Sequence, residues 1–458
     1  MNNQRRIALG LVALDVGTSI ATFNVLIHLR GITIGQGVVF TPLAGPILIA
    51  VCAIYLIEGY KPRTDMLSVD YTSQHAIALI GAMITTLLLT FVIIPKDYPL
   101  QSSRLVIALS FTALIPLTLT YRRRIYLRVL ASRGERSLVF LGDRDSCAAF
   151  RAEAEKMKTT QRVIYSVITE ESAAPFANVD GETLQTFHDV LDDLQQHRIA
   201  VEAIILRESA RELSPEISRR LVQLYFSGVP TYTLELFHQV YWRKIPLYRL
   251  NQTWLFQEGF QIAREPVFER LKRASDVGLS LLGLILAAPL ITLAAIAIWM
   301  EDRGPVFFAQ MRVGKNHVPF RLLKLRTMRS VRTNDELYTR RGDSRITRVG
   351  RFLRATRLDE LPQLWNVLRG TMSLIGPRAE WDRLVDNYER DIPCYHFRHL
   401  VKPGITGWAQ VNYPYGASRE DTLRKLEYDL YYIRHFSFRL DATIVLKTIH
   451  IMLVGSGR

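Results

Sequence analysis

Four long apolar runs near the N-terminus constrain the fold of this chain more than any other feature. They cover residues 7–29, 38–57, 75–95 and 105–121. A helix rises about 1.5 Å per residue, so runs of this length can cross a hydrocarbon layer about 30 Å thick. No small-residue cleavage site ends the first run and further runs follow it, which favours a span over a cleaved signal peptide. The sequence therefore predicts a transmembrane domain of four helices at residues 1–125.

Basic residues flank these runs on one side of the expected bundle. They lie before the first run, between the second and the third, and after the fourth: Arg5, Arg6, Lys61, Arg63 and the segment YRRRIYLR. Because positively charged loops stay on the cytoplasmic side, both ends of the bundle are predicted to face the cytosol. Asp15 is the charged residue of the first run, and the other runs offer it no basic partner. We therefore expect Asp15 to make interhelical hydrogen bonds rather than to serve ion transport.

The composition excludes a disordered chain, because 48% of the 458 residues are hydrophobic and only 22% are charged. The formal net charge of +15 by itself suits nucleic acid, an anionic membrane surface or an anionic substrate. With the apolar runs present, we predict the lipid bilayer as a partner and no nucleic acid. Cys52, Cys147 and Cys394 lack the spacing of zinc or thiol-exchange motifs.

The pattern changes after residue 136, where short apolar runs alternate with amphipathic ones. The expected strands are 137–142, 162–168, 201–206 and 229–234, and the expected helices are 145–157, 183–197 and 214–226. This alternation predicts a Rossmann-like parallel α/β domain at residues 136–240. The segment GDRDSC after the first strand has a single glycine and two acids where a dinucleotide-binding turn needs several glycines. We therefore expect a regulatory or oligomerisation module without a cofactor.

A fifth apolar run, residues 277–300, contains no charged residue and is long enough to span a bilayer as one straight helix. Basic residues flank it on both sides: Arg264, Arg270, Lys272 and Arg273 before it, and Arg303, Arg312 and Lys315 after it. A crossing helix would export one of these clusters, against the positive-inside rule. Pro289 removes an amide donor in the middle of the run. We therefore predict a proline-broken re-entrant helix at residues 274–300, with both ends in the cytosol.

Charged residues of both signs gather in the segment that follows. In FRLLKLRTM, Lys324 and Arg326 stand two apart on an expected strand and so share a face, a spacing that suits a diphosphate. In RLDELPQ, Asp359 and Glu360 follow several arginines, which are expected to keep both acids ionised. Such carboxylates can attack phosphorus or hold Mg²⁺. Arg378 follows a Gly-Pro turn that can aim its guanidinium at phosphate oxygens. A solvated basic face on anionic lipid is the other interpretation of many of the basic residues.

The remaining features of this half are less specific. The loop at 401–413, rich in glycine and proline, carries an aromatic residue and is predicted to form part of a pocket rim. The apolar run at 440–453 is too short to span a bilayer, and we expect it to pack on the protein core. A structural role explains His317, His396 and His435 at least as well as a catalytic one.

Three linked segments, KLRTM, ITRVGRFLRATRLDELPQLWNVLRGTMSLIGPR and KPGITGWAQVN, follow the proline-containing apolar run in this order. With them, residues 265–458 resemble the bacterial sugar transferases, which are polyprenyl-phosphate sugar-1-phosphate transferases. The catalytic domain is accordingly expected at 264–458, as a mostly helical α/β fold that includes the re-entrant helix. The preceding spans and Rossmann-like domain resemble the long, polytopic form of the family. The segment VNYPYGAS at 411–418 is similar to the type found with exosortase (PEP-CTERM) exopolysaccharide systems.

The resemblance implies that a UDP-sugar donates its sugar 1-phosphate to undecaprenyl phosphate and releases UMP. This EC 2.7.8-type transfer begins exopolysaccharide or O-antigen synthesis, and it implies a multi-pass protein of the bacterial inner membrane with a cytosolic catalytic domain. The family's covalent nucleophile corresponds to Asp359 and its catalytic partner to Glu360, with Mg²⁺ on this pair. Four further positions correspond to substrate-binding residues: Lys324, Arg326, Gln363 and Arg378. A homodimer is one assembly compatible with the sequence.

Three positions depart from the usual family pattern. Ala288-Pro289 stands where Ser-Pro is common, Pro377-Arg378-Ala379 where Pro-Arg-Pro is common, and Tyr413-Pro414 where Gly-Arg is common. The last departure leaves the sugar unassigned. Two other functions fit parts of the sequence. A polyisoprenyl-phosphate glycosyltransferase would transfer the sugar alone and release UDP, and a membrane scaffold or chain-length regulator would bind partners through its basic surface.

Overall fold

The computed structural model divides the chain into two compact units, Met1–Arg243 and Lys244–Arg458. The structure describes residues 3–32, 37–61, 64, 66–94, 99–134, 136–157, 159, 161–167, 185–196, 198–207, 213–247, 266–329, 343, 345–414, 416 and 418–454. The statements below concern these residues.

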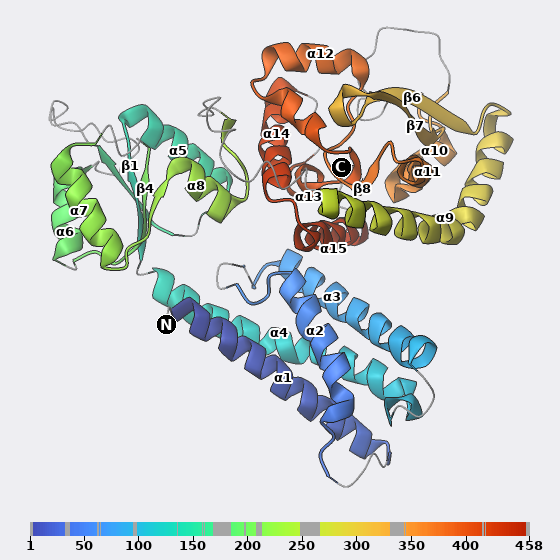
Figure 1. Ribbon diagram of the computed structural model, residues 1–458, viewed down its shortest axis with the longest axis horizontal. Coiled ribbons are helices and arrows are strands. Elements are labelled where there is room, and N and C mark those ends of the chain that lie inside the picture. Colours follow the sequence, from blue (N-terminus) through green and yellow to red (C-terminus); the bar gives the residue numbers. More distant parts are fainter. Residues whose placement is uncertain are drawn as a thin grey trace. The chain divides into compact units, whose positions relative to one another are not determined.

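The first unit begins with the apolar helices, which pack on one another in Figure 1. They are α1 (Asn3–Leu29), α2 (Ala44–Leu56), α3 (Val69–Leu88) with its extension η2 (Leu89–Ile93), and α4 (Arg104–Gly134). Four helices of the described chain are long and apolar enough to cross a membrane: Arg5–Leu29, Tyr71–Ile93, Arg104–Val129 and Glu269–Asp302. The first three confirm the apolar helices predicted for the first, third and fourth runs.

The structure corrects the length of the helix in the second predicted span. Residues 38–57 contain η1 (Thr41–Leu43) and the 13-residue helix α2. Pro42 and Pro46 restrict where this helix can begin, because proline is tolerated only in the first turn. Glu58, just beyond its end, has a left-handed φ of 62°. The apolar helical segment, Thr41–Leu56, is therefore shorter than the predicted run, and its crossing of the membrane stays a prediction.

Asp15 makes the expected interhelical hydrogen bond, to Tyr121 of α4, but it also has a basic partner that was not predicted. Its carboxylate forms an ion pair with Arg122 of α4, and it accepts hydrogen bonds from Tyr60 at 2.6 Å and from Tyr121. The Arg122 side chain is 0% exposed and also donates to the carbonyl oxygen of Gly59 at 2.6 Å. Arg122 lies in the basic segment that was assigned to the cytoplasmic flank, but α4 continues through this segment and buries the guanidinium.

The middle of the chain confirms the predicted parallel α/β sheet. Its strands are β1 (Ser137–Leu141), β2 (Val163–Val167), β3 (Gln185–Thr186), β4 (Val201–Leu206) and β5 (Thr231–Thr233). They pair in the order β3-β2-β1-β4-β5, and every pairing is parallel. This order places β1 centrally, as in doubly wound folds. All five residues of β1 are buried, as expected for a strand covered on both faces.

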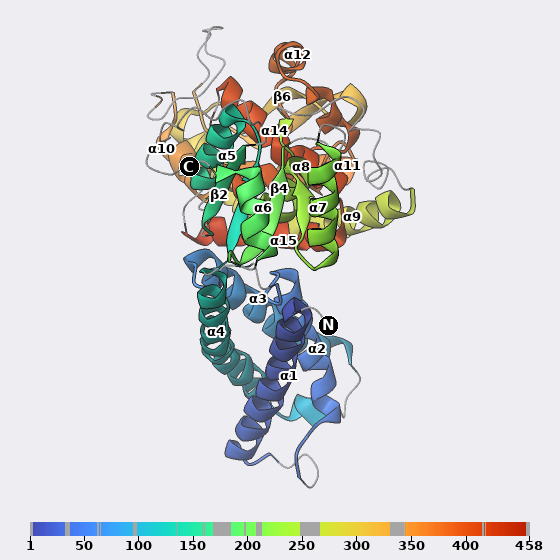
Figure 2. The ribbon, with the colours of Figure 1, turned by 90° about the vertical axis from the view of Figure 1, so that its left-hand side faces the viewer.

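Helices cover both faces of this sheet (Figure 1). One face holds α5 (Arg144–Lys156) and α8 (Leu234–Phe237), which is followed by η5 (His238–Trp242). The other face holds α6 (Phe187–Gln195) and α7 (Pro215–Phe226), which lie in front of the strands in Figure 2. Asp143 caps α5 by accepting a hydrogen bond from the Ser146 amide at 2.8 Å, and it pairs with Arg207. A carboxylate therefore holds the helix N-terminus where a dinucleotide phosphate would bind. The absence of a cofactor stays a prediction.

The second unit is mostly helical, as predicted for the catalytic domain, and contains two small sheets. The hairpin β6 (Phe307–Val313) and β7 (Pro319–Leu325) turns at η9 (Lys315–His317), and β8 (Ser373–Ile375) pairs with β9 (Gly404–Thr406) in parallel. The helices are α9 (Pro266–Asp302), α10 (Arg348–Thr356), η10 (Leu358–Glu360), α11 (Gln363–Arg369), α12 (Asp382–Asp391), η11 (Tyr395–Leu400), α13 (Trp408–Asn412), α14 (Arg419–Arg434) and α15 (Phe438–Val454).

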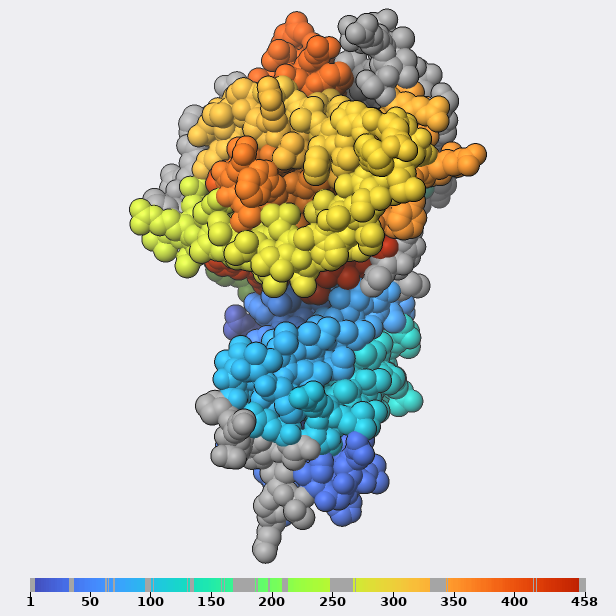
Figure 3. Space-filling model, turned by 90° about the vertical axis from the view of Figure 1, so that its right-hand side faces the viewer, coloured from blue at the N-terminus to red at the C-terminus, as the bar shows by residue number. Residues whose placement is uncertain are grey.

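Helix α9 differs in detail from the broken helix that was predicted. It is one continuous element of 37 residues that contains Pro289, and Figure 1 shows it bending within its length. A proline removes one backbone donor and can bend a helix while the other hydrogen bonds persist. Figure 3 shows the outer surface of α9 as a yellow-green to yellow band. This surface includes large exposed apolar side chains: Ile285, Leu286, Leu293 and Met300.

The core of the second unit lies among α12, α13, α14, α15 and the loops that join them. Trp408, which belongs to the loop predicted as a pocket rim, is 2% exposed and is part of this core. That prediction is therefore wrong for the indole. Ile444 of α15 is fully buried in the same core, which confirms that the C-terminal run packs on the protein.

Candidate active site

The Asp359–Glu360 pair lies in a tight turn between two helices. Helix α10 ends at Thr356. The next residue, Arg357, has a φ of 56° in the left-handed region, and η10 then carries both acids into α11. Gly350 brings α10 against the end of β7, since a Cβ on it would lie 2.1 Å from the carbonyl oxygen of Thr327. The turn directs Asp359 inward, and this residue is 8% exposed.

Cations surround Glu360. Lys324 Nζ lies 3.0 Å and Arg378 Nη1 lies 3.7 Å from Glu360 Oε1, and Arg357 Nη1 lies 3.9 Å from Oε2. Burial raises the pKa of Glu360, but Lys324, Arg378 and Arg357 together outweigh it and lower the pKa to about 2. Glu360 is therefore ionised at neutral pH, in agreement with the expectation from sequence.

Asp359 behaves differently from its neighbour. Burial raises its pKa, the negative charge of Glu360 raises it further, and Lys324 and Arg354 lower it, with a net shift upward. The sequence analysis considered only the attraction by nearby arginines, whereas here the loss of water outweighs the attraction by the cations and shifts the pKa upward. A carboxylate with a raised pKa is the more basic and the more nucleophilic of the two.

Two hydrogen bonds between the Asn366 side chain and the backbone of β7 hold Lys324 near the acids. It lies on β7, and the Asn366 side chain of α11 donates to the Arg321 carbonyl oxygen at 2.7 Å and accepts from the Leu323 amide at 3.0 Å. These hydrogen bonds fix β7 to α11, the helix that follows the acids. Burial lowers the pKa of Lys324, and Glu360 partly offsets this effect.

Among the described residues, Arg326 forms its ion pair with Asp302 and not with Asp359 or Glu360, although the spacing predicted a face shared with Lys324. It lies just beyond the end of β7, is 9% exposed, and pairs with Asp302 at the C-terminus of α9. A neighbouring residue, Glu301, accepts hydrogen bonds from the first amides of α10, Arg348 N at 2.8 Å and Val349 N at 3.2 Å. These contacts tie the apolar helix to the segment that carries the acids.

Gln363 and Arg378 come from different segments. Gln363 begins α11, three positions after Glu360, and is buried. Arg378 follows Gly376, whose amide donates to the Thr406 carbonyl oxygen at 2.9 Å, and the Gly404 amide donates to Pro377 at 2.9 Å. A Cβ on Gly376 would lie 2.3 Å from the Lys402 carbonyl oxygen, so only glycine allows the two loops to dock.

Sequence reasoning missed several residues of this cluster. Arg354 and Arg357 lie in the quoted motif, and their spacing ahead of the acids was a usable signal. Arg354 is notable because its Nη1 atom is buried and has no hydrogen-bond partner in the described part of the chain. Asp302 and Asn366 are polar residues at the edge of or inside apolar runs, and nothing in the pattern indicated their partners.

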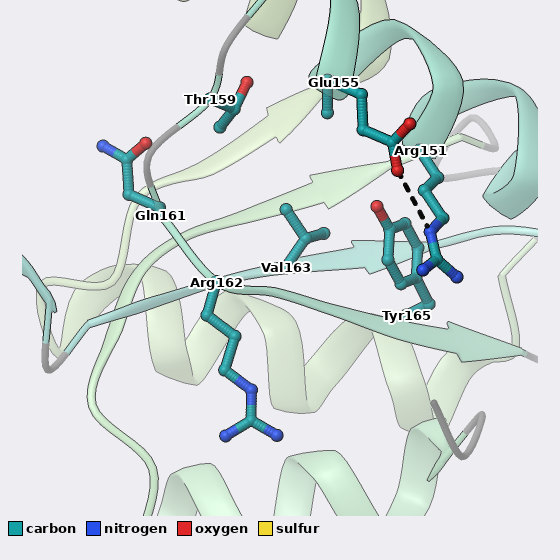
Figure 4. A pocket seen from close by; sticks show the side chains of 8 residues that line it. Arg151, Glu155, Thr159, Gln161, Arg162, Val163 and Tyr165 are labelled. Carbon is teal, nitrogen blue, oxygen red and sulfur yellow. Dashed lines mark ion pairs between the residues drawn. The ribbon is translucent and has the colours of Figure 1, made fainter. Parts of the chain in front are cut away.

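A pocket in the first unit has no comparable pair of acids among its lining residues. It lies beside β2 and α5 and is lined by Arg151, Ala154, Glu155, Thr159, Gln161, Arg162, Val163 and Tyr165 (Figure 4). Its charged side chains Arg151 and Glu155 pair with each other at 3.5 Å. The cluster around Asp359 is therefore the stronger candidate for catalysis.

Comparison with known proteins agrees with this choice. The family model described as bacterial sugar transferase matches residues 267–455. A UDP-glucose:undecaprenyl-phosphate glucose-1-phosphate transferase of Caulobacter vibrioides is 45% identical over 185 residues, which cover 40% of this chain and 69% of that protein. The chain belongs to the bacterial sugar transferase family. All of the acids and cations around Asp359 lie within the matched residues of this sugar transferase.

Two longer relatives match less of their length. A UDP-N-acetylgalactosamine-undecaprenyl-phosphate N-acetylgalactosaminephosphotransferase of Aeromonas hydrophila is 37% identical over 269 residues, covering 58% of this sugar transferase and 63% of the relative. A UDP-glucose:undecaprenyl-phosphate glucose-1-phosphate transferase of Escherichia coli is 45% identical over 185 residues, covering 39% of each chain. The sugar transferase thus spans less than two thirds of these two relatives.

Proposed function

We propose that this sugar transferase moves sugar 1-phosphate from a UDP-sugar to undecaprenyl phosphate, giving undecaprenyl-diphosphate sugar and UMP. The reaction would begin the synthesis of an exopolysaccharide or O-antigen-type glycan. The observation that carries the proposal is a buried Asp359 beside an ionised Glu360 that Lys324 and Arg378 contact at 3.0 and 3.7 Å. The names of the relatives support the donor and acceptor classes.

The first step is an attack by a carboxylate oxygen of Asp359 on the β-phosphorus of the UDP-sugar. A bond forms between this oxygen and phosphorus, and the bond from the β-phosphorus to the bridging oxygen breaks. UMP leaves with that oxygen and its electron pair, and the sugar phosphate stays on Asp359 as an acyl phosphate. In the second step, a phosphate oxygen of undecaprenyl phosphate attacks the same phosphorus and releases Asp359 as a carboxylate.

The cations around the acids would stabilise the negative charge that develops during both steps. Lys324 and Arg378 already contact Glu360 and need little movement to reach phosphate oxygens. The unpartnered Nη1 atom of Arg354 is a further donor for such an oxygen. Glu360 holds these cations in place, so we assign it a positioning role beside the nucleophile.

The site also fits Mg²⁺, which prefers carboxylate oxygen ligands. Among the described residues no cation lies within ion-pair distance of Asp359, while both oxygens of Glu360 face cations. Asp359 would therefore be the main ligand, with Glu360 adjacent to it. When bound, Mg²⁺ would supply positive charge that favours the ionised form of Asp359 and offsets the charge of the diphosphate.

Identification of the nucleotide product tests the proposed reaction. Purified protein, undecaprenyl phosphate and a panel of UDP-sugars, incubated with Mg²⁺, are expected to yield UMP in equal amount to the lipid product. A transferase that moves the sugar alone would instead release UDP, and a scaffold would release neither. Chromatography of the nucleotides separates the three outcomes, and UDP as the main product would overturn the proposal.

We further propose that α9 enters the inner membrane from the cytosol and returns, so that the acids lie near the lipid phosphate. Its exposed apolar side chains support membrane contact, and the bend in Figure 1 is compatible with re-entry. The contacts of Arg326 with Asp302 and of Glu301 with α10 would then hold the catalytic turn at the membrane surface.

Labelling of single cysteines in intact cells tests this topology. In a cysteine-free background, Arg270→Cys and Pro305→Cys place an exposed thiol before and after the apolar part of α9. Both are expected to resist a membrane-impermeant maleimide, as Lys61→Cys should at the predicted cytosolic loop. Ser103→Cys, at the predicted external loop, is the positive control. If Pro305→Cys is labelled from outside as strongly as Ser103→Cys, then α9 crosses the membrane and the re-entrant topology is wrong.

A further inference from the structure

The second unit contains a second cluster of ligand-type side chains, made of residues that take no part in the cluster around Asp359. His317 comes from η9 at the hairpin turn, Glu389 from α12 and His399 from η11. His317 Nδ1 lies 3.4 Å and His399 Nε2 lies 3.9 Å from Glu389 Oε1. One potential ligand atom from each residue lies within 4.8 Å of the other two. Figure 1 shows α12 next to the β6–β7 hairpin.

His399 points to a missing partner in this cluster. Its side chain is 6% exposed, and Nε2 has no hydrogen-bond partner in the part of the chain that the structure describes. Buried polar atoms nearly always have a partner, because leaving one unpaired is unfavourable.

We propose that His317, Glu389 and His399 bind a divalent transition-metal ion, Zn²⁺ in particular. Two imidazole nitrogens and one carboxylate oxygen are typical zinc ligands, whereas Mg²⁺ prefers oxygen alone. Tetrahedral Zn²⁺ with bonds of about 2.0–2.1 Å requires ligand atoms separated by about 3.3 Å. The two shorter separations here, 3.4 and 3.9 Å, need only small side-chain movements to meet this value. His317 and Glu389 are exposed, so water can complete the coordination.

The ion would join three segments that are far apart in the sequence: the hairpin turn, α12 and η11. Arg398, next to His399, donates to the carbonyl oxygen of Arg378 at 3.0 Å and pairs with Asp429 at 2.9 Å. The metal would therefore stabilise the segment that supports the Arg378 loop. This role is structural, goes beyond the proposed transfer reaction and does not depend on it.

Metal titration of the full chain tests the site. Tag-free protein is purified in detergent, stripped with a chelator, and titrated with Zn²⁺ and, separately, Co²⁺ in the presence of millimolar Mg²⁺, which occupies oxygen-only sites. We expect one equivalent of bound Zn²⁺, visible absorption typical of four-coordinate Co²⁺, and a Zn²⁺-dependent rise in Tm. His317→Ala and Glu389→Gln change exposed side chains, so both variants should fold, and each should lose at least about tenfold in affinity.

His396→Ala is the matched control, because His396 is an exposed histidine of the same η11 segment outside the cluster. It should bind Zn²⁺ like the unchanged protein. The proposal is overturned if the unchanged protein binds no stoichiometric Zn²⁺, or if binding survives in both His317→Ala and Glu389→Gln. UMP release by the same preparations with Mg²⁺ reports separately on the proposed reaction, because Asp359 is intact in every variant.

Discussion

Asp359→Asn is expected to lower the rate of UMP release by at least about 10⁴-fold, the size of effect seen when a catalytic nucleophile is removed. Asparagine has nearly the same shape as aspartate but cannot displace UMP from the β-phosphorus. The residue is 8% exposed and forms no ion pair among the described residues, so the change should leave the fold intact. The measurement is initial UMP release at saturating UDP-sugar and undecaprenyl phosphate.

A control is available on the same unit. Asp386→Asn removes an exposed carboxylate of α12 and should leave the rate of UMP release unchanged. The Tm of each variant separates a loss of catalysis from a loss of folding. An Asp359→Asn protein that folds and releases UMP at a rate near that of the unchanged protein would exclude Asp359 as the nucleophile.

Glu360→Gln and Lys324→Gln are expected to shift the pH profile of kcat/KM in opposite directions. The reaction needs ionised Asp359, so activity should fall as pH drops through its pKa. Burial is the main cause of the raised pKa of Asp359, Glu360 raises it further and Lys324 lowers it. Glu360→Gln should therefore lower this pKa and move the acid limb to lower pH, and Lys324→Gln should raise it and move the limb to higher pH.

Both variants should also lose activity on the order of 10²-fold at the optimum, because each disturbs the cations that stabilise charge in the transition state. Lys324→Gln removes one such cation directly, and Glu360→Gln removes the anion that Lys324, Arg378 and Arg357 contact. The profiles are measured as kcat/KM for the UDP-sugar across pH. Shifts of the same sign in both variants would show that the acid limb does not report on Asp359.

Local patterns in the sequence were sufficient to predict much of this fold. The apolar runs predicted all four candidate membrane helices of the described chain, α9 among them, and the alternating pattern predicted the parallel sheet. The pair Asp359–Glu360 and its neighbour Lys324 were also identified from short motifs. These features depend on residues that are close in the chain, where hydrophobicity and spacing determine the outcome.

Ion pairs between residues far apart in the chain could not be predicted from the sequence. Asp15 pairs with Arg122 and Arg326 pairs with Asp302, and no spacing rule relates either pair. The direction of the Asp359 pKa shift depends on burial, which adjacent arginines do not reveal. Trp408 entered the core because α13 and α14 pack around it, whereas loop composition alone suggested a rim. Each failure arose where tertiary packing, and not local pattern, decides the environment of a side chain.

Trapping of the covalent intermediate tests the central claim most directly. Protein incubated with UDP-sugar carrying ³²P in the β-phosphate, without undecaprenyl phosphate, is quenched and digested for peptide mapping. We predict up to one label per chain, located on the peptide that contains Asp359, together with an equal burst of UMP and release of the label when undecaprenyl phosphate is added. Label on a different residue, or full turnover with no labelled protein at any time, would contradict the account.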